Sequence, residues 1–134
     1  MEELVIEFHL DAASRLSPYQ QLVQQVRHAL RLGLLSEGDQ LPKVKDVVAQ
    51  LVINPNTVLK AYRELEHDGL VAARPGVGTF VTATLAGPPP AVVGSLRRDL
   101  RKWLAKARLA GLDGEGIEAL FTTTLHSAAQ GETA

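Results

Sequence analysis

"INPNTVLKAYRELEHDGLV", residues 53–71, is the stretch that decides the fold, because it predicts one helix with both ends marked. Asn54 can cap the first exposed N–H groups, and Pro55 follows at the first helical position, where its missing N–H costs nothing. Gly69 is placed to end the helix in a left-handed turn. Between these ends an apolar stripe at helical spacing is formed by Val58, Ala61, Tyr62 and Leu65. Asn56 and Thr57 lie outside this stripe and need another explanation.

The residues before this helix predict a second one, joined to it by a tight turn. Its inner face follows Pro42 and consists of Val44, Val47, Val48 and Leu51. Valine is a mediocre helix former, so this helix must depend on tertiary packing. Only residues 52–54 separate the two helices, which is typical of a helix-turn-helix.

The flanking segments complete a winged helix-turn-helix, so the expected fold is mainly α with a small β-hairpin. Ser17-Pro18-Tyr19-Gln20 predicts a helix start with a capping box, and Gly33 ends that helix. Residues 4–10 alternate apolar and polar side chains, which predicts a short strand. Residues 70–74 and 79–82 are two β-prone runs about a Pro/Gly turn, which predicts a hairpin.

Domain boundaries are predicted from composition. We expect a winged domain with an N-terminal strand over residues 1–83, a Pro-rich linker over 84–95, a helical hairpin over 96–126 and a flexible tail over 127–134. The hairpin is too small to bury its own apolar stripes, so a second copy of the chain is expected to cover them. The predicted dimerisation residues are Leu96, Leu100, Trp103, Leu104, Ile117, Leu120 and Phe121.

Composition excludes several functions. The chain has 134 residues, no cysteine and a net charge of −1, so disulfide scaffolds and thiol chemistry are excluded and overall charge does not indicate nucleic acid. The four histidines are scattered and no pair has metal-ligand spacing. We find no phosphate loop, no catalytic constellation, no signal peptide and no membrane span. The expectation is a cytoplasmic non-enzyme without cofactor or metal.

In their order, these motifs resemble the DNA-binding domain of GntR-family bacterial transcription factors. The resemblance covers residues 4–83 and is carried by Leu41-Pro42, Asn54-Pro55-Asn56-Thr57-Val58, Tyr62-Arg63-Glu64-Leu65-Glu66, Asp68-Gly69-Leu70, Arg74-Pro75-Gly76 and Gly78-Thr79-Phe80-Val81. The tail, with Gly111-Leu112 and Ile117-Glu118-Ala119-Leu120-Phe121, resembles the two-helix domain of the YtrA-like branch. In that branch the tail mediates dimerisation and no large ligand-binding domain is present.

Four positions depart from the family pattern. Lys43 and Lys45 stand where the family usually has Ser and Arg; lysine keeps the charge but loses the bidentate fork, so phosphate anchoring is expected to survive better than base reading. Val52 stands where the turn usually has Gly, and a β-branched residue disfavours positive φ, so a reshaped turn is expected. Val77 stands where the wing tip is often basic, which predicts a weaker wing contact.

The resemblance explains the two polar residues outside the stripe. In helix-turn-helix proteins the N-terminal residues of the second helix contact base edges, where Asn can pair with adenine and the Thr methyl can touch thymine. We therefore interpret Asn56 and Thr57 as the sequence-reading tip, flanked by Asn54 and Lys60, with Pro55 fixing the helix start. The alternative is that residues 54–57 form only a good cap.

The other candidate residues lie beside this tip. Lys43 and Lys45 are predicted to contact phosphates, and Arg74 the DNA backbone or minor groove. Gly76, Gly78 and Thr79 frame the wing, where the glycines are best explained by turn geometry. Tyr19 is either a core residue or a phosphate donor.

A basic run marks the first helix of the tail: Arg97, Arg98, Arg101, Lys102, Lys106 and Arg108. Such a run can indicate a membrane surface or nucleic acid, but we interpret it as a solvated face opposite the dimer seam. The predicted partners are double-stranded DNA with an inverted repeat, a second copy of the chain and an unidentified small-molecule effector. Two rivals stay open: a winged helix that binds protein, and a fragment of a pyridoxal-phosphate fusion enzyme.

Overall fold

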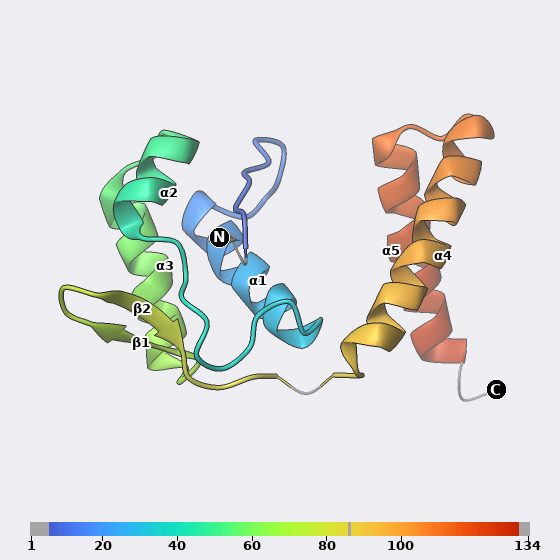
Figure 1. The fold of residues 1–134 in the computed structure, drawn as a ribbon. Helices are drawn as coiled ribbons and strands as arrows, with labels where there is room; N and C mark the ends of the chain where they lie inside the picture. Colours follow the sequence, from blue (N-terminus) through green and yellow to red (C-terminus); the bar gives the residue numbers. More distant parts are fainter. Residues whose placement is uncertain (1–5, 86, 132–134) are drawn as a thin grey trace. The chain divides into compact units, whose positions relative to one another are not determined.

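The computed structural model describes residues 6–85 and 87–131, which form five helices and one antiparallel hairpin (Figure 1). The elements are α1 (Pro18–Arg31), α2 (Val44–Leu51), α3 (Pro55–His67), β1 (Val71–Arg74), β2 (Gly78–Val81), α4 (Pro90–Leu109) and α5 (Gly114–Gly131). The predicted fold class is confirmed. The chain divides into two compact units after Pro90. None of the described helices is long and apolar enough to cross a membrane.

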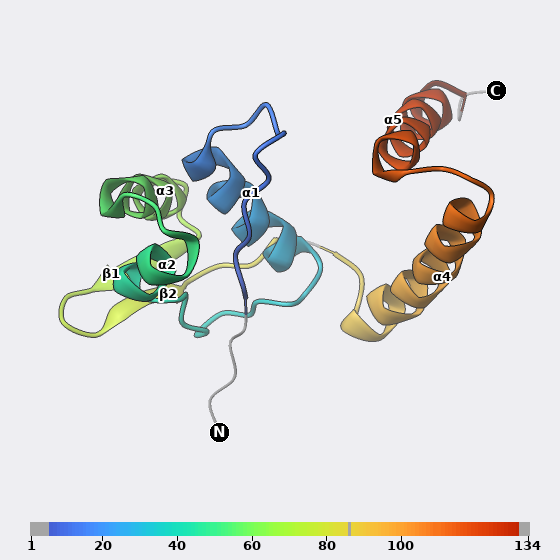
Figure 2. The same ribbon diagram turned by 90° about the horizontal axis from the view of Figure 1, so that it is seen from above.

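The first unit is built around α3, which packs against α1, α2 and β1. Figures 1 and 2 show α3 beside α1, with the hairpin following from its C-terminal end. The stripe on α3 is buried as predicted, and it meets the buried faces of α1 and α2. The largest fully buried side chains of this core are Leu22, Leu30, Leu35, Leu41, Leu65, Val26, Val47, Val58 and Val81. Burial of this apolar surface fixes the orientation of α3, whose N-terminal tip remains outside the core.

The predicted N-terminal strand is wrong over residues 6–10, and residues 4 and 5 lie outside the described residues. The alternation itself is real, because Phe8 is buried while Glu7 and His9 are exposed. Among the described residues, no neighbouring strand pairs with this segment. Instead, the Gln25 side chain accepts from His9 N at 3.1 Å and donates to His9 O at 2.8 Å. One turn earlier, Gln21 accepts from Asp11 N at 2.8 Å. Amide side chains of α1 thus replace a strand partner.

The turn between α2 and α3 keeps a left-handed residue despite the substitution of valine for glycine. Val52 closes α2 with φ 54° and ψ 56°, the only positive φ at a non-glycine residue in the described part of the chain. Its backbone N–H donates to Val48 O at 2.8 Å, and its side chain is 86% exposed. The expected reshaping of this turn is therefore wrong. Because α2 and α3 both pack into the core, they hold Val52 in a conformation that costs a β-branched residue about 1–2 kcal/mol.

The hairpin pairs Val71 with Val81 and Arg74 with Gly78, and a third segment extends it. Residues 38–41 lie along β2, where Leu41 N donates to Thr79 O at 2.9 Å. The Gln40 side chain donates to Val77 O at 3.2 Å and occupies the space that a Cβ at position 78 would need. Gly78 has φ 149°, a backbone conformation that L side chains rarely adopt, so glycine is favoured there, and a Cβ would also displace the flexible end of the Gln40 side chain.

The second unit consists of α4 and α5, joined by a short loop. Within it Val93, Ala107 and Ile117 are buried, and the Trp103 and Phe121 rings lie 5.0 Å apart between centroids. The helix α4 begins at Pro90, so it includes residues 90–95, which the sequence analysis placed in the linker. Proline suits a first helical position, which explains the earlier start.

The last helix also extends beyond its predicted end. Residues 127–131 continue α5 rather than forming part of a flexible tail, because Ala and Gln are good helix formers. Residues 132–134 lie outside the described residues.

Candidate nucleic-acid interface

The N-terminal tip of α3 is exposed and capped. The Asn54 side chain accepts from Asn56 N at 2.7 Å, so Asn54 is occupied as the helix cap. Asn56 is exposed, and within the described residues no hydrogen bond holds its amide group. Thr57 is half-buried beside it. Asn56 and Thr57 are the residues predicted to read bases. The Asn54 side chain, in contrast, is engaged in capping α3.

The tip of α3 faces a hollow of about 310 Å³ that also involves the start of α1. Its lining consists of Ser17, Pro18, Tyr19, Asn54, Asn56, Thr57 and Lys60. The Lys60 ammonium nitrogen lies 4.1 Å from the centroid of the Tyr19 ring. The aromatic face holds this cation at the edge of the hollow.

Tyr19 also lies within the electrostatic influence of Glu64, one helical turn beyond Lys60 on α3. The negative charge of Glu64 is the main cause that raises the pKa of Tyr19 above its ordinary value. The phenol therefore stays neutral at physiological pH. The sequence left Tyr19 open between core and phosphate donor. The half-buried Tyr19 packs against the core, as the first alternative expects, and its ring also lies under Lys60, which the sequence did not predict.

A second hollow, also about 310 Å³, lies between the start of α2 and the wing. It is lined by Lys43, Val44, Tyr62, Ala73, Arg74, Gly76, Val77, Gly78 and Thr79. Lys43 is thus brought to the four predicted wing residues, whereas Lys45 is exposed on α2 and lines neither hollow. The Arg74 guanidinium packs over the Phe80 ring at 4.4 Å. This stacking keeps the charge beside the wing rather than leaving it on a freely moving side chain.

Two residues that the sequence did not predict as part of the candidate site shape this second hollow. Gln40 holds the wing tip through its hydrogen bond to Val77 O. The Tyr62 hydroxyl donates to Pro42 O at 2.6 Å, which fixes the start of α2, and with it Lys43, against α3. Burial raises the pKa of Tyr62, so it remains a hydrogen-bond donor. The stripe on α3 predicted a buried Tyr62, but no local signal predicts which carbonyl its hydroxyl meets.

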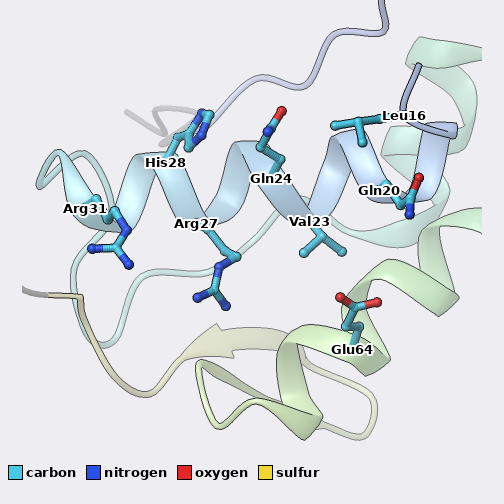
Figure 3. A pocket seen from close by; sticks show the side chains of 8 residues that line it. All are labelled: Leu16, Gln20, Val23, Gln24, Arg27, His28, Arg31 and Glu64. Atoms are coloured by element: carbon cyan, nitrogen blue, oxygen red, sulfur yellow. The ribbon is translucent and has the colours of Figure 1, made fainter. Parts of the chain in front are cut away.

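A third hollow, of about 370 Å³, lies between the outer edges of α1 and α3 (Figure 3). Arg27 from α1 and Glu64 from α3 point into it from opposite sides. Its charges are of both signs, and Arg27 is paired with Asp68 at 3.5 Å. The residues that line this hollow do not identify the small-molecule effector that the sequence left open. Among the described residues, no group of three His, Asp or Glu could hold a metal ion.

Most of the first unit matches a family of bacterial regulators. Residues 18–81 match the family described as "Bacterial regulatory proteins, gntR family". The HTH-type transcriptional repressor YtrA of Bacillus subtilis (strain 168) is 31% identical over 112 residues, which cover 81% of this chain and 84% of YtrA. The chain belongs to the GntR family. Its resemblance to the YtrA-like branch is confirmed, and GntR-family regulators are not enzymes.

Solved structures agree with this GntR-family fold. A transcriptional antiterminator from Listeria monocytogenes EGD-e matches with a TM-score of 0.56 and 28% identity, covering 89% of this chain and 90% of that one. The structure of AraR(DBD) in complex with operator ORX1 matches with a TM-score of 0.50 and 23% identity, covering 56% of this chain and 93% of that one. At that identity the AraR match shows the fold alone.

Proposed function

We propose that this GntR-family chain is a sequence-specific DNA-binding transcriptional repressor that binds an inverted-repeat operator as a homodimer. The observation that carries the proposal is the exposed tip of α3, where the Asn56 amide is without a hydrogen bond in the described part of the chain. An exposed Asn on the first turn of the second motif helix can form two hydrogen bonds with adenine in the major groove. The neighbouring Thr57 adds an apolar contact suited to thymine.

Cations on both sides of α3 support this orientation. Lys60 stands over Tyr19 on one side, and Lys43 and Arg74 line the hollow beside the wing on the other. Phosphates flank the major groove on both sides, so a base-reading helix between two cationic edges matches the charge pattern of duplex DNA. Lys45, exposed on α2, is assigned to the same backbone. Gly76, Gly78 and Thr79 shape the wing that presents Arg74.

The second unit supports a homodimer. Its apolar side chains are only partly covered by α4 and α5 themselves: Leu96 is 59%, Leu100 43% and Leu120 42% exposed. A second copy would cover these leucines and would present two α3 helices to two half-sites. Trp103, Leu104 and Phe121 are half-buried and Ile117 is buried in the hairpin, so these four support the seam from within. We assign repression rather than activation because the similar protein YtrA is named a transcriptional repressor.

Selection of bound duplexes from a random DNA pool tests the proposal, run with the wild type, Asn56→Ala and Gln24→Ala. Gln24 is the matched control, because it is also an exposed helical amide but lies on α1. Wild type and Gln24→Ala should recover one palindromic motif, and Asn56→Ala should lose information at one position of each half-site. No motif from the wild type would contradict sequence-specific reading. An unchanged motif from Asn56→Ala would remove Asn56 from the reading tip.

A protein-binding winged helix is the alternative. Residues 1–90 contain eight Lys and Arg against ten Asp and Glu, so the first unit has no net positive charge. Partner binding that survives Asn56→Ala and is lost with Trp103→Ala would favour this alternative over DNA reading.

A further inference from the structure

The outer face of α4 is basic along its whole length. Arg97, Arg98, Arg101, Lys102, Lys106 and Arg108 all lie within about half of the helix circumference, opposite Leu96, Leu100 and Trp103, and the exposed Leu109 lies within the same half. All the basic residues are exposed except Arg97, which is half-buried. Asp99 is the sole acidic residue between Pro90 and Leu109, and it lies at the margin of this arc. We call these six residues the α4 basic face.

The spacing of these charges destabilises an isolated helix. Arg97 with Arg101, Arg98 with Lys102, and Lys102 with Lys106 are like-charge pairs four residues apart, which repel one another on a helix. In the described part of the chain none of the six forms an ion pair with an acidic residue. A polyanion bound to this helix face would relieve the repulsion between these side chains.

The opposite side of α4 distinguishes a nucleic acid from a membrane. A helix that lies in a membrane surface must insert its apolar face into the lipid. On α4 that face is engaged by α5, because Ala107 and Ile117 are buried and Trp103 lies against Phe121. The leucines of that face that α5 leaves exposed are covered by the second copy in the proposed homodimer. The α4 basic face is then left available to a further partner. A row of phosphates can bind it through charge alone, without any apolar contact.

We propose that the α4 basic face binds the phosphate backbone of duplex DNA outside the stretch contacted by the first unit. The proposal rests on the proposed function, since an operator held by α3 tethers duplex DNA to the chain that carries α4. The α4 basic face would also supply positive charge that the first unit lacks. The first unit has more acidic than basic residues, so by itself it attracts a polyanion weakly.

The test uses the full chain and two duplexes with the same selected site, one trimmed to the site and one with about 20 flanking base pairs on each side. The charge-removing variant is Arg98→Gln, Arg101→Gln, Lys102→Gln and Lys106→Gln, all at exposed positions. The matched control exchanges the same residues as Arg98→Lys, Arg101→Lys, Lys102→Arg and Lys106→Arg, which keeps every charge. Gln, Lys and Arg are all good helix formers, so the helix should persist, and circular dichroism checks this.

We expect the charge-removing variant to bind the flanked duplex about tenfold more weakly than the wild type near 0.1 M salt, with the trimmed duplex changed less than about twofold. The slope of log K against log salt on the flanked duplex should fall in magnitude by about 0.9 for each phosphate that the variant no longer neutralises. The charge-keeping control should match the wild type.

Equal slopes for the wild type and the charge-removing variant on the flanked duplex would overturn the proposal. So would charge-dependent binding to vesicles of phosphatidylserine and phosphatidylcholine with no charge-dependent change on DNA, which would assign α4 to a membrane. Failure of the proposed function is distinguishable. If the wild type selects no motif, a long duplex of arbitrary sequence is used, and its binding should still depend on the α4 basic face.

Discussion

The ammonium nitrogen of Lys60 lies 4.1 Å from the centroid of the Tyr19 ring, so a residue of α1 positions a cation of α3. Lys60 also lines the hollow at the α3 tip together with Asn56 and Thr57. The contact therefore links the packing of α1 on α3 to the charge presented beside the proposed reading residues. Tyr19 also packs against the core at the start of α1, so its ring joins the core to this surface cation.

This contact predicts that the ring of Tyr19, and not its hydroxyl, supports DNA binding. Tyr19→Phe should bind the operator within about twofold of the wild type, whereas Tyr19→Leu should bind about two- to fivefold more weakly, the value of an exposed cation–π contact. Fluorescence anisotropy with a labelled operator measures both. If Tyr19→Phe weakens binding as much as Tyr19→Leu does, the hydroxyl is the contributing group and Tyr19 acts as a phosphate donor.

Tyr62 predicts a loss of stability at alkaline pH. Burial raises the pKa of Tyr62 above its ordinary value of 10.0, so the folded state keeps the proton that the unfolded chain releases near that pH. Its contribution to the free energy of unfolding is therefore complete below pH 10 and is lost as the pH rises above 10. Urea unfolding at several pH values between about 8 and 11 should show this decline.

Tyr62→Phe is the control for that measurement. It removes the titrating group together with the 2.6 Å hydrogen bond to Pro42 O, so it should cost about 1–2 kcal/mol at neutral pH and weaken the alkaline decline. Tyr19→Phe keeps the Tyr62 hydroxyl and its hydrogen bond, so it should leave most of the decline in place. A decline of equal size in Tyr62→Phe would show that other groups cause it.

Local signals predicted most of this fold because the helix ends carry their own chemistry. Ser17 and Gln20 form the capping box that the sequence indicated, with Ser17 N donating to Gln20 Oε1 at 3.0 Å. Asn54 and Pro55 likewise start α3 where predicted. Such caps are interactions between residues two or three positions apart, so the sequence alone is enough to predict them.

The sequence could not predict contacts in which a distant side chain replaces a backbone partner. Period-two alternation over residues 4–10 indicated a strand, but Gln21 and Gln25 supply the hydrogen bonds that a strand neighbour would have supplied. Gln40 under the wing is a similar case. Polar glutamines within a helix predict only solvent exposure, so nothing local distinguishes Gln21 and Gln25 from Gln24. The candidate site residues were found through motif resemblance, and their DNA contacts stay predictions.

A single glutamate in the exposed apolar face of α4 should abolish dimerisation. Leu100 is 43% exposed, on the side that the proposed seam covers, and burying an unpaired carboxylate against a second copy is strongly unfavourable. We expect Leu100→Glu to sediment as a monomer at concentrations where the wild type is a dimer. Leu109→Glu is the control, because Leu109 is 91% exposed and lies on the opposite side of α4. Equal masses for the wild type and both variants would exclude this face as the seam.

Replacing Val52 with glycine should stabilise the chain without changing its DNA affinity. Val52 is held at φ 54°, where its Cβ crowds the backbone, and its side chain is 86% exposed, so the substitution removes little packing. The relief of strain exceeds the extra entropy of glycine in the unfolded chain, and a net gain of about 0.5–1 kcal/mol is expected in urea unfolding. Ala49→Gly is the matched control: it places glycine at an exposed interior position of the same helix and should cost about 1 kcal/mol. If Val52→Gly destabilises as much as Ala49→Gly does, the left-handed valine carries no strain, and the turn is stabilised by the valine itself.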